Sequence, residues 1–176
     1  MLGGGGLHPQ SNVHREVNEM NEYHRILVAT DNSEQGRLVL DRARTLLQES
    51  DASLSLLQVL EHIPATVLSD VVPPEGMDKG AWMEFTARNR LSQLAEENQL
   101  SAAEVVVVSG SPREQIVRVA KEQKADLIVI GAHERHGLSR LRPSTTDSVV
   151  HHAPCDVLTV HTVCDIEAGG DYSALG

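Results

Sequence analysis

Short runs of apolar, largely β-branched residues alternate with longer amphipathic segments along the chain. The short runs predict five strands, over residues 25–30, 53–60, 104–109, 125–132 and 155–160. The segments between them have apolar residues at helical spacing and predict four helices, over residues 33–50, 78–98, 112–123 and 145–152. This alternation predicts an α/β fold: a doubly wound, five-stranded parallel sheet with right-handed crossovers and helices on both faces.

The predicted helices differ in how clearly their buried faces can be assigned. In the first helix the apolar positions at helical spacing are Leu38, Ala43, Leu46 and Leu47. In the second they are Trp82, Phe85, Leu91 and Leu94. We interpret the partial stripe that includes Trp82 and Phe85 as core packing, and a partner surface is the alternative.

Composition narrows the class of protein. A chain of 176 residues favours a single domain, which we place at residues 23–163, between flexible tails at 1–22 and 164–176 that lack apolar periodicity. The net charge of -10 and the absence of a basic stripe argue against DNA or RNA as a partner. No apolar run is long enough for membrane insertion. The two cysteines have no CxxC spacing, which favours a reducing compartment, the cytoplasm.

A ligand site is expected where the sheet order reverses, outside the carboxyl ends of the strands that end at Thr30 and Ile130. Asp31 follows the first of these strands directly. Its carboxylate could accept hydrogen bonds from a ribose, or it could form a turn and cap the next helix. Both interpretations stay open from the sequence.

Other chemistry is not supported. Nine histidines include the close pairs His133 with His136 and His151 with His152, but this spacing does not put two ligands on one helix face, so we predict no metal site. The hydroxyls at 144–146 lie near Asp147 without a recognisable Ser-His-Asp arrangement, and helix capping explains them better. We therefore assign no catalytic residue and expect no enzyme.

The stretch from Gly131 to Thr146, GAHERHGLSRLRPSTT, is the most specific part of the sequence. Together with ILVATDNSE at residues 26–34 and APCDVLTV at residues 153–160, it resembles the universal stress protein family. The resemblance covers about residues 25–160. It implies the adenine-nucleotide alpha-hydrolase-like architecture, with strand order 3-2-1-4-5.

The ATP-binding members of that family carry a G-x2-G-x9-G-[ST] loop, which this chain keeps only in part. Gly131 and Thr145 match, whereas Glu134 and Ser144 stand in place of the second and third glycines. A carboxylate at residue 134 repels phosphates and adds a Cβ where close approach is needed. Arginines at 135, 140 and 142 partly restore favourable charge. We predict a degenerate nucleotide pocket without tight ATP binding, and retained ATP binding is the alternative.

The resemblance also implies where a nucleotide would lie. The adenine would lie near Val59, at the end of the second strand, and the ribose near Asp31. The phosphates would lie near residues 131 and 144–146, with His133 beside them. The candidate site residues are Ala29, Thr30, Asp31, Val59, Gly131, His133, Ser144, Thr145 and Thr146.

The function that the resemblance implies is a cytoplasmic stress protein, a non-enzymatic regulatory or protective module. It is expected to be a homodimer joined through the last strand, Cys155 to Val160, and a regulatory protein partner is possible. The alternative is an ATP-dependent switch, with slow hydrolysis or self-phosphorylation on Ser144 or Thr145, that controls a partner such as a transporter.

Overall fold

The computed structural model describes residues 23–31, 33–48, 50–61, 72–132 and 144–161. The tails predicted at 1–22 and 164–176, and residues 133–143 with the candidate His133, lie outside these ranges. The elements follow each other as β1 (Arg25–Ala29), α2 (Glu34–Gln48), β2 (Ser53–Leu60), α3 (Lys79–Glu97), β3 (Glu104–Ser109), α4 (Pro112–Gln123), β4 (Leu127–Ala132), α5 (Thr145–His152) and β5 (Asp156–His161).

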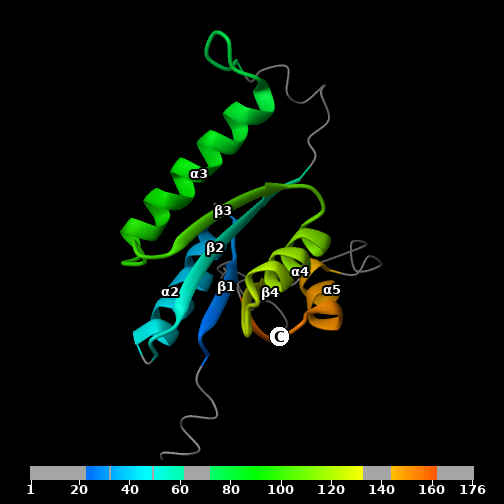
Figure 1. Ribbon diagram of the computed structural model, residues 1–176. Coiled ribbons are helices and arrows are strands. Elements are labelled where there is room, and N and C mark those ends of the chain that lie inside the picture. Colours follow the sequence, from blue (N-terminus) through cyan, green and yellow to red (C-terminus); the bar gives the residue numbers. More distant parts are fainter. Residues whose placement is uncertain (1–22, 32, 49, 62–71, 133–143, 162–176) are drawn as a thin grey trace, which may run out of the picture.

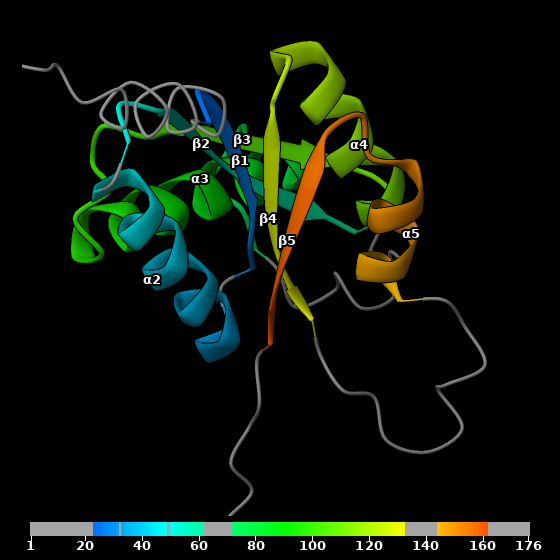
Figure 2. The same ribbon diagram turned by 90° about the horizontal axis from the view of Figure 1, so that it is seen from below.

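The five strands form one sheet in the order β3-β2-β1-β4-β5, and every neighbouring pair is parallel. Figures 1 and 2 show the sheet between two layers of helices, with α2 and α3 on one face and α4 and α5 on the other. The predicted fold class and strand order are confirmed. None of the described helices combines the length and apolar character needed to cross a membrane.

The core has two halves, one on each face of the sheet. Towards α2 and α3, strand residues such as Val28 and Leu56 pack against Leu40 and Leu91 of the helices. Towards α4 and α5, the buried residues are Leu27, Ala29, Leu57, Ile116, Val119, Ala120, Ala125, Ile128, Ile130 and Val149. Because both faces of the central strands are covered, β1 and β4 consist almost entirely of apolar residues, as parallel sheets require.

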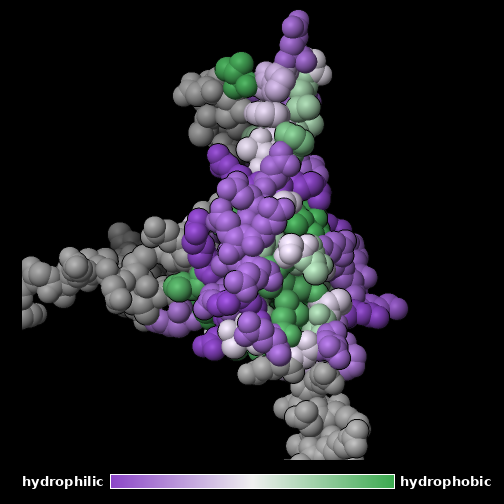
Figure 3. Space-filling view, turned by 90° about the vertical axis from the view of Figure 1, so that its left-hand side faces the viewer, coloured by the Kyte–Doolittle hydropathy of each residue, from purple (hydrophilic) through white to green (hydrophobic). Residues whose placement is uncertain are grey.

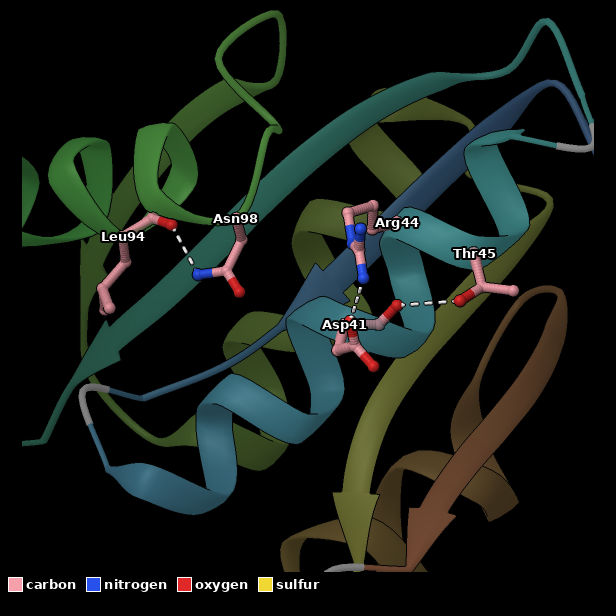
Figure 4. A network of polar contacts seen from close by, with 5 residues as sticks. All are labelled: Asp41, Arg44, Thr45, Leu94 and Asn98. Atoms are coloured by element: carbon pink, nitrogen blue, oxygen red, sulfur yellow. Dashed lines mark hydrogen bonds and ion pairs between the residues drawn. The ribbon is translucent and has the colours of Figure 1, made fainter.

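The helix ends are fixed by local polar contacts. The carboxylate of Asp78 accepts a hydrogen bond from the Ala81 amide at 3.1 Å, which caps the start of α3. At its other end the Asn98 side-chain amide donates to the Leu94 carbonyl at 2.7 Å (Figure 4). Both are typical ways of satisfying the unpaired backbone groups of a helix terminus.

Leu38 does not face the core, which corrects the sequence-based expectation. Its exposure is 47%, whereas Val39, Leu40 and Ala43 are the buried residues of α2. Residues two apart on a helix lie about 200° apart around its axis, so the face that buries Leu40 turns Leu38 outward. The apolar positions alone allowed more than one stripe, and packing against the sheet selected this one.

Phe85 is also exposed, at 50%, so the prediction that it packs in the core is wrong. The buried residues of α3 are Ala87, Leu91 and Ala95, and Phe85 lies on the opposite side of the helix from Ala87. The N-terminal turns of α3 extend beyond the sheet (Figure 1). There Phe85 stacks on the half-buried Trp82, with ring centroids 5.7 Å apart. Figure 3 shows a mixture of hydrophobic and hydrophilic residues on this protruding end, and a hydrophobic strip between hydrophilic residues on the body below it.

The contrast between Leu91 and Phe85 can be tested by truncation. Leu91→Ala should lower the free energy of unfolding by about 2–5 kcal/mol, because it opens a cavity in the core. Phe85→Ala should cost less than about 1 kcal/mol, because its ring is half in solvent. Urea denaturation followed by circular dichroism measures both. Equal losses for the two variants would show that the N-terminal half of α3 packs against the protein in solution.

Candidate functional site

A cavity of about 230 Å³ opens at the carboxyl ends of β1, β2 and β4. This is the point where the sheet order reverses, since β1 pairs with β2 on one side and with β4 on the other. The described residues that line it are Ala29, Thr30, Asp31, Gly36, Val39, Leu57, Val59, Glu61, Pro112, Ile116, Ile130, Gly131, Ser144, Thr145 and Thr146.

The structure brings eight of the nine sequence-predicted candidates together around this cavity. They come from three separate parts of the chain: residues 29–31, residue 59, and residues 131 and 144–146. The ninth, His133, lies outside the described residues, as do Glu134 and the three arginines of the same segment. The eight described candidates therefore line one cavity, and their contacts with a ligand stay a prediction.

Sequence reasoning missed Gly36, the apolar wall and Glu61. Side chains alternate between the two faces of a strand, so Leu57, Val59 and Glu61 share one side of β2 and its continuation. That alternation was the signal that could have found Glu61 once Val59 was singled out. The wall residues Val39 and Ile116 come from helices on opposite faces of the sheet, and only the assembled fold places them together.

Asp31 forms a tight turn at the rim of the cavity. Its Oδ1 accepts hydrogen bonds from the Ser33 amide, at 3.1 Å, and from the Ser33 hydroxyl. The Gly36 amide in turn donates to Ser33 Oγ at 3.1 Å. The turn-forming interpretation of Asp31 is thus observed. A contact between Asp31 and a ribose stays a prediction, and it would form in addition to the hydrogen bonds of this turn.

Ser144 is the N-cap of α5. Its hydroxyl oxygen accepts from the Asp147 amide at 2.9 Å, and the Asp147 carboxylate accepts from the Ser144 amide at 3.0 Å, which completes a capping box. The backbone of Ser144 has φ −68°, a conformation open to any residue. The third-glycine position that the sequence comparison gave to Ser144 therefore has no need of glycine's conformational freedom.

Thr146 connects α5 to the end of β4. Its hydroxyl donates to the Gly131 carbonyl at 2.8 Å, which holds the first turn of the helix against the strand. The cavity thus has apolar walls, formed mainly by aliphatic side chains, and a polar rim of hydroxyls and carboxylates. This arrangement suits a flat, partly apolar ligand that carries several polar groups at one side.

A second polar cluster lies at the opposite end of the sheet and does not resemble a reactive site. The Tyr23 hydroxyl donates to Asp156 at 3.0 Å, and this bond, more than burial, raises the pKa of Tyr23. Burial, assisted by the nearby charges of Asp126 and Asp156, raises the pKa of the Cys155 thiol. A raised pKa keeps the thiol protonated and a poor nucleophile. Within the described ranges, no three His, Cys, Asp or Glu side chains gather as metal ligands would.

Comparison with known proteins gives a consistent result. The model of the universal stress protein family matches residues 22–161. Universal stress protein A homolog 2 of Coxiella burnetii is 33% identical over 144 residues, which are 80% of this chain and 97% of that protein. These matches span the whole sheet and both helix layers.

Solved structures have the same fold. The universal stress protein UspA from Lactobacillus plantarum is 30% identical, with a TM-score of 0.60 over 79% of this chain and 98% of its own. A universal stress protein in complex with cAMP is 24% identical, with a TM-score of 0.63 over 81% of this chain and 100% of its own. At that identity the second likeness shows the fold alone.

Gly36 provides a test of the turn at the cavity rim. A Cβ at this position would lie 2.3 Å from the Asp31 carbonyl oxygen and 2.6 Å from Thr30 Oγ1. Glycine to alanine inside a helix normally stabilises by about 0.5–1 kcal/mol. Here we expect Gly36→Ala to destabilise by about 1–3 kcal/mol, because the turn must move.

Gly80→Ala is the matched control, because Gly80 is also helical and its Cβ would meet only the Asp78 carboxylate, at 3.0 Å. It should leave the urea midpoint near that of the unmodified protein or raise it. A Gly36→Ala variant as stable as Gly80→Ala would show that Thr30 and Asp31 do not pack against Gly36 in this way.

Proposed function

Because this chain belongs to the universal stress protein family, we propose that it is a regulatory or protective stress protein that binds an adenine nucleoside or nucleotide without catalysis. The observation that carries the proposal is the cavity where β1 and β4 end. Eight residues singled out from three distant segments of the sequence line it together. The similar structure that contains cAMP makes adenine compounds the ligand class to test first.

In the proposed complex the base lies on the apolar wall beside Val59, and the ribose hydroxyls face Asp31. Any phosphate lies towards Gly131, Ser144, Thr145 and Thr146. The half-buried position of Val59 at the end of β2 supports this placement, since a flat ring can cover it without displacing the core.

The proposal assigns no catalytic residue. The Ser144 hydroxyl oxygen caps α5, and the Thr146 hydroxyl donates to the Gly131 carbonyl, so both have structural roles that a nucleophile would have to give up. Binding and release of a ligand, and the contact with a regulatory protein partner, are the proposed activities. We place the protein in the cytoplasm on the cysteine pattern.

We further propose a homodimer joined along β5. The two edge strands of the sheet differ: on β3 the Val105 carbonyl receives a hydrogen bond from Arg88 Nη1 at 2.8 Å. Half-buried apolar residues occur on both edge strands: Val105, Val106 and Val108 on β3, and Val157, Leu158 and Val160 on β5. Among the described residues, no side chain makes such a contact to the backbone of these three β5 residues. Leu38 and Val150, on the two helices that flank β5, are 47% and 48% exposed. Apolar edges of this kind favour pairing with a second strand.

Ligand binding can be tested with a matched pair of variants. Val59 and Val108 are neighbours in the β2–β3 register and both are half-buried, but only Val59 lines the cavity. Val59→Phe should weaken adenosine or cAMP binding by about tenfold or more, equivalent to about 1.4 kcal/mol, because the ring fills the base position. Val108→Phe should leave it unchanged. Isothermal titration calorimetry measures both, after any co-purified nucleotide has been released by denaturation and identified.

Failure of every adenine compound to bind would refute the proposed ligand class. Equal affinities of Val59→Phe and Val108→Phe for the adenine compound would show that the base does not bind at Val59. Recovery of co-purified ATP would favour the ATP-dependent switch over a module that lacks tight ATP binding.

The dimer has its own test. Thr159→Lys adds a charge to the exposed face of β5, and a lysine on an edge strand opposes pairing. We expect this variant to be a monomer by light scattering after gel filtration. Ser109→Lys, at an exposed position of the other edge strand, should remain a dimer. A monomeric unmodified protein, or dissociation only on Ser109→Lys, would exclude an interface along β5.

A further inference from the structure

We propose that the cavity selects an uncharged nucleoside, with adenosine as the reference compound, over nucleotides that carry several phosphate charges, and that Glu61 and Asp147 enforce this selection. The inference rests on the proposed function, that an adenine compound binds in the cavity. It names the charge class of the ligand and two residues that set it, which neither the sequence pattern nor the family assignment supplies.

The described lining of the cavity is acidic. Asp31 and Glu61 both line the cavity, and no lysine or arginine does so among the described residues. Asp147 adds a third carboxylate at the first turn of α5, next to the lining residues Ser144, Thr145 and Thr146. A ligand with several negative charges is repelled by each of these groups, whereas a neutral ligand is not.

On the side where phosphates are expected, several hydrogen-bond donors are already used within the protein. The Thr146 hydroxyl already donates to the Gly131 carbonyl at 2.8 Å. The Ser144 amide donates to the Asp147 carboxylate at 3.0 Å, and the Asp147 amide donates to Ser144 Oγ at 2.9 Å. A helix start binds phosphate through such amides. Here the capping box uses two of them, and the Asp147 carboxylate provides the negative charge that a phosphate would bring.

The rim of the cavity and a nucleoside have complementary hydrogen-bonding groups. The rim is rich in acceptors, since carboxylates only accept when ionised. A nucleoside offers hydroxyl and amino donors and no charge, so it can satisfy these acceptors without repulsion. The aliphatic wall, which includes Val39, Leu57 and Ile116, covers the base. A donor-rich, uncharged ligand is therefore favoured by the acidic lining, by the donors already used within the protein and by the acceptor-rich rim.

The test is a calorimetric series with the full chain: adenosine, AMP and ATP at one ionic strength and without added magnesium. The unmodified protein should bind adenosine most tightly, with affinity falling as phosphates are added, and the differences should shrink at high salt because screening weakens charge repulsion. Glu61→Gln and Asp147→Asn should each reduce the ratio of the ATP to the adenosine dissociation constant by about threefold or more, since each removes one repelling charge.

Glu96→Gln is the control, because Glu96 is an exposed residue of α3 outside the cavity lining; it should leave the ratio unchanged. Asp147→Asn also alters the capping box, so circular dichroism must show an intact fold, and Glu61→Gln tests the inference without touching that box. ATP binding tighter than adenosine to the unmodified protein, or an unchanged ratio in Glu61→Gln, overturns the inference and leaves the proposed function standing. No binding by any of the three compounds overturns both.

Discussion

Parallel pairing of β1 with both β2 and β4 is the constraint on which the rest of this structure depends. The register joins Val28 to Leu56 on one side and to Val129 on the other, and all three side chains are fully buried. From this central strand the chain leads to α2 on one face of the sheet, whereas β4 leads towards α5 on the opposite face. The connections therefore diverge, and the space between them is the cavity. Burial of β1 and β4 thus fixes both the core and the position of the site.

The same polar groups hold the fold together and form the rim of the cavity. Asp31, Ser33 and Gly36 close the turn after β1, and Thr146 attaches α5 to the end of β4. Hydroxyl and carboxylate groups that a ligand could contact are thus already oriented by intramolecular bonds. Such groups need little reorganisation on binding, because their conformational entropy is already lost in the folded protein. The corresponding limit is that donors used internally are not available to the ligand.

Much of the fold was predictable because strand and helix patterns differ in period and the chain alternates between them regularly. Part of the cavity lining was predictable because Thr30, Asp31 and Gly131 lie at strand ends, where sequence position fixes spatial position, whereas residues 144–146 were found through the family resemblance. The orientation of Leu38 and Phe85 was not, since an apolar residue near the edge of a helical stripe can face either way until the sheet is in place. The capping role of Ser144 was predictable, because its partner Asp147 lies only three residues further along the chain. The meeting of Val39 and Ile116 in the cavity wall was not, because it depends on packing between distant segments, which a single sequence does not encode as a local pattern.

The hydrogen bond from Arg88 to the Val105 carbonyl occupies a backbone group of the edge strand β3 that another strand would need for pairing. The two edges of the sheet therefore differ in how readily they can add a strand. A sheet with two open borders can add strands at both, so that copies join head to tail without limit and form fibres. When one border is obstructed, a molecule that associates through the other has no further strand to offer. Assembly then stops at a closed pair. In the proposed dimer, this contact of Arg88 on β3 would favour a closed pair joined along β5 over open-ended growth of the sheet.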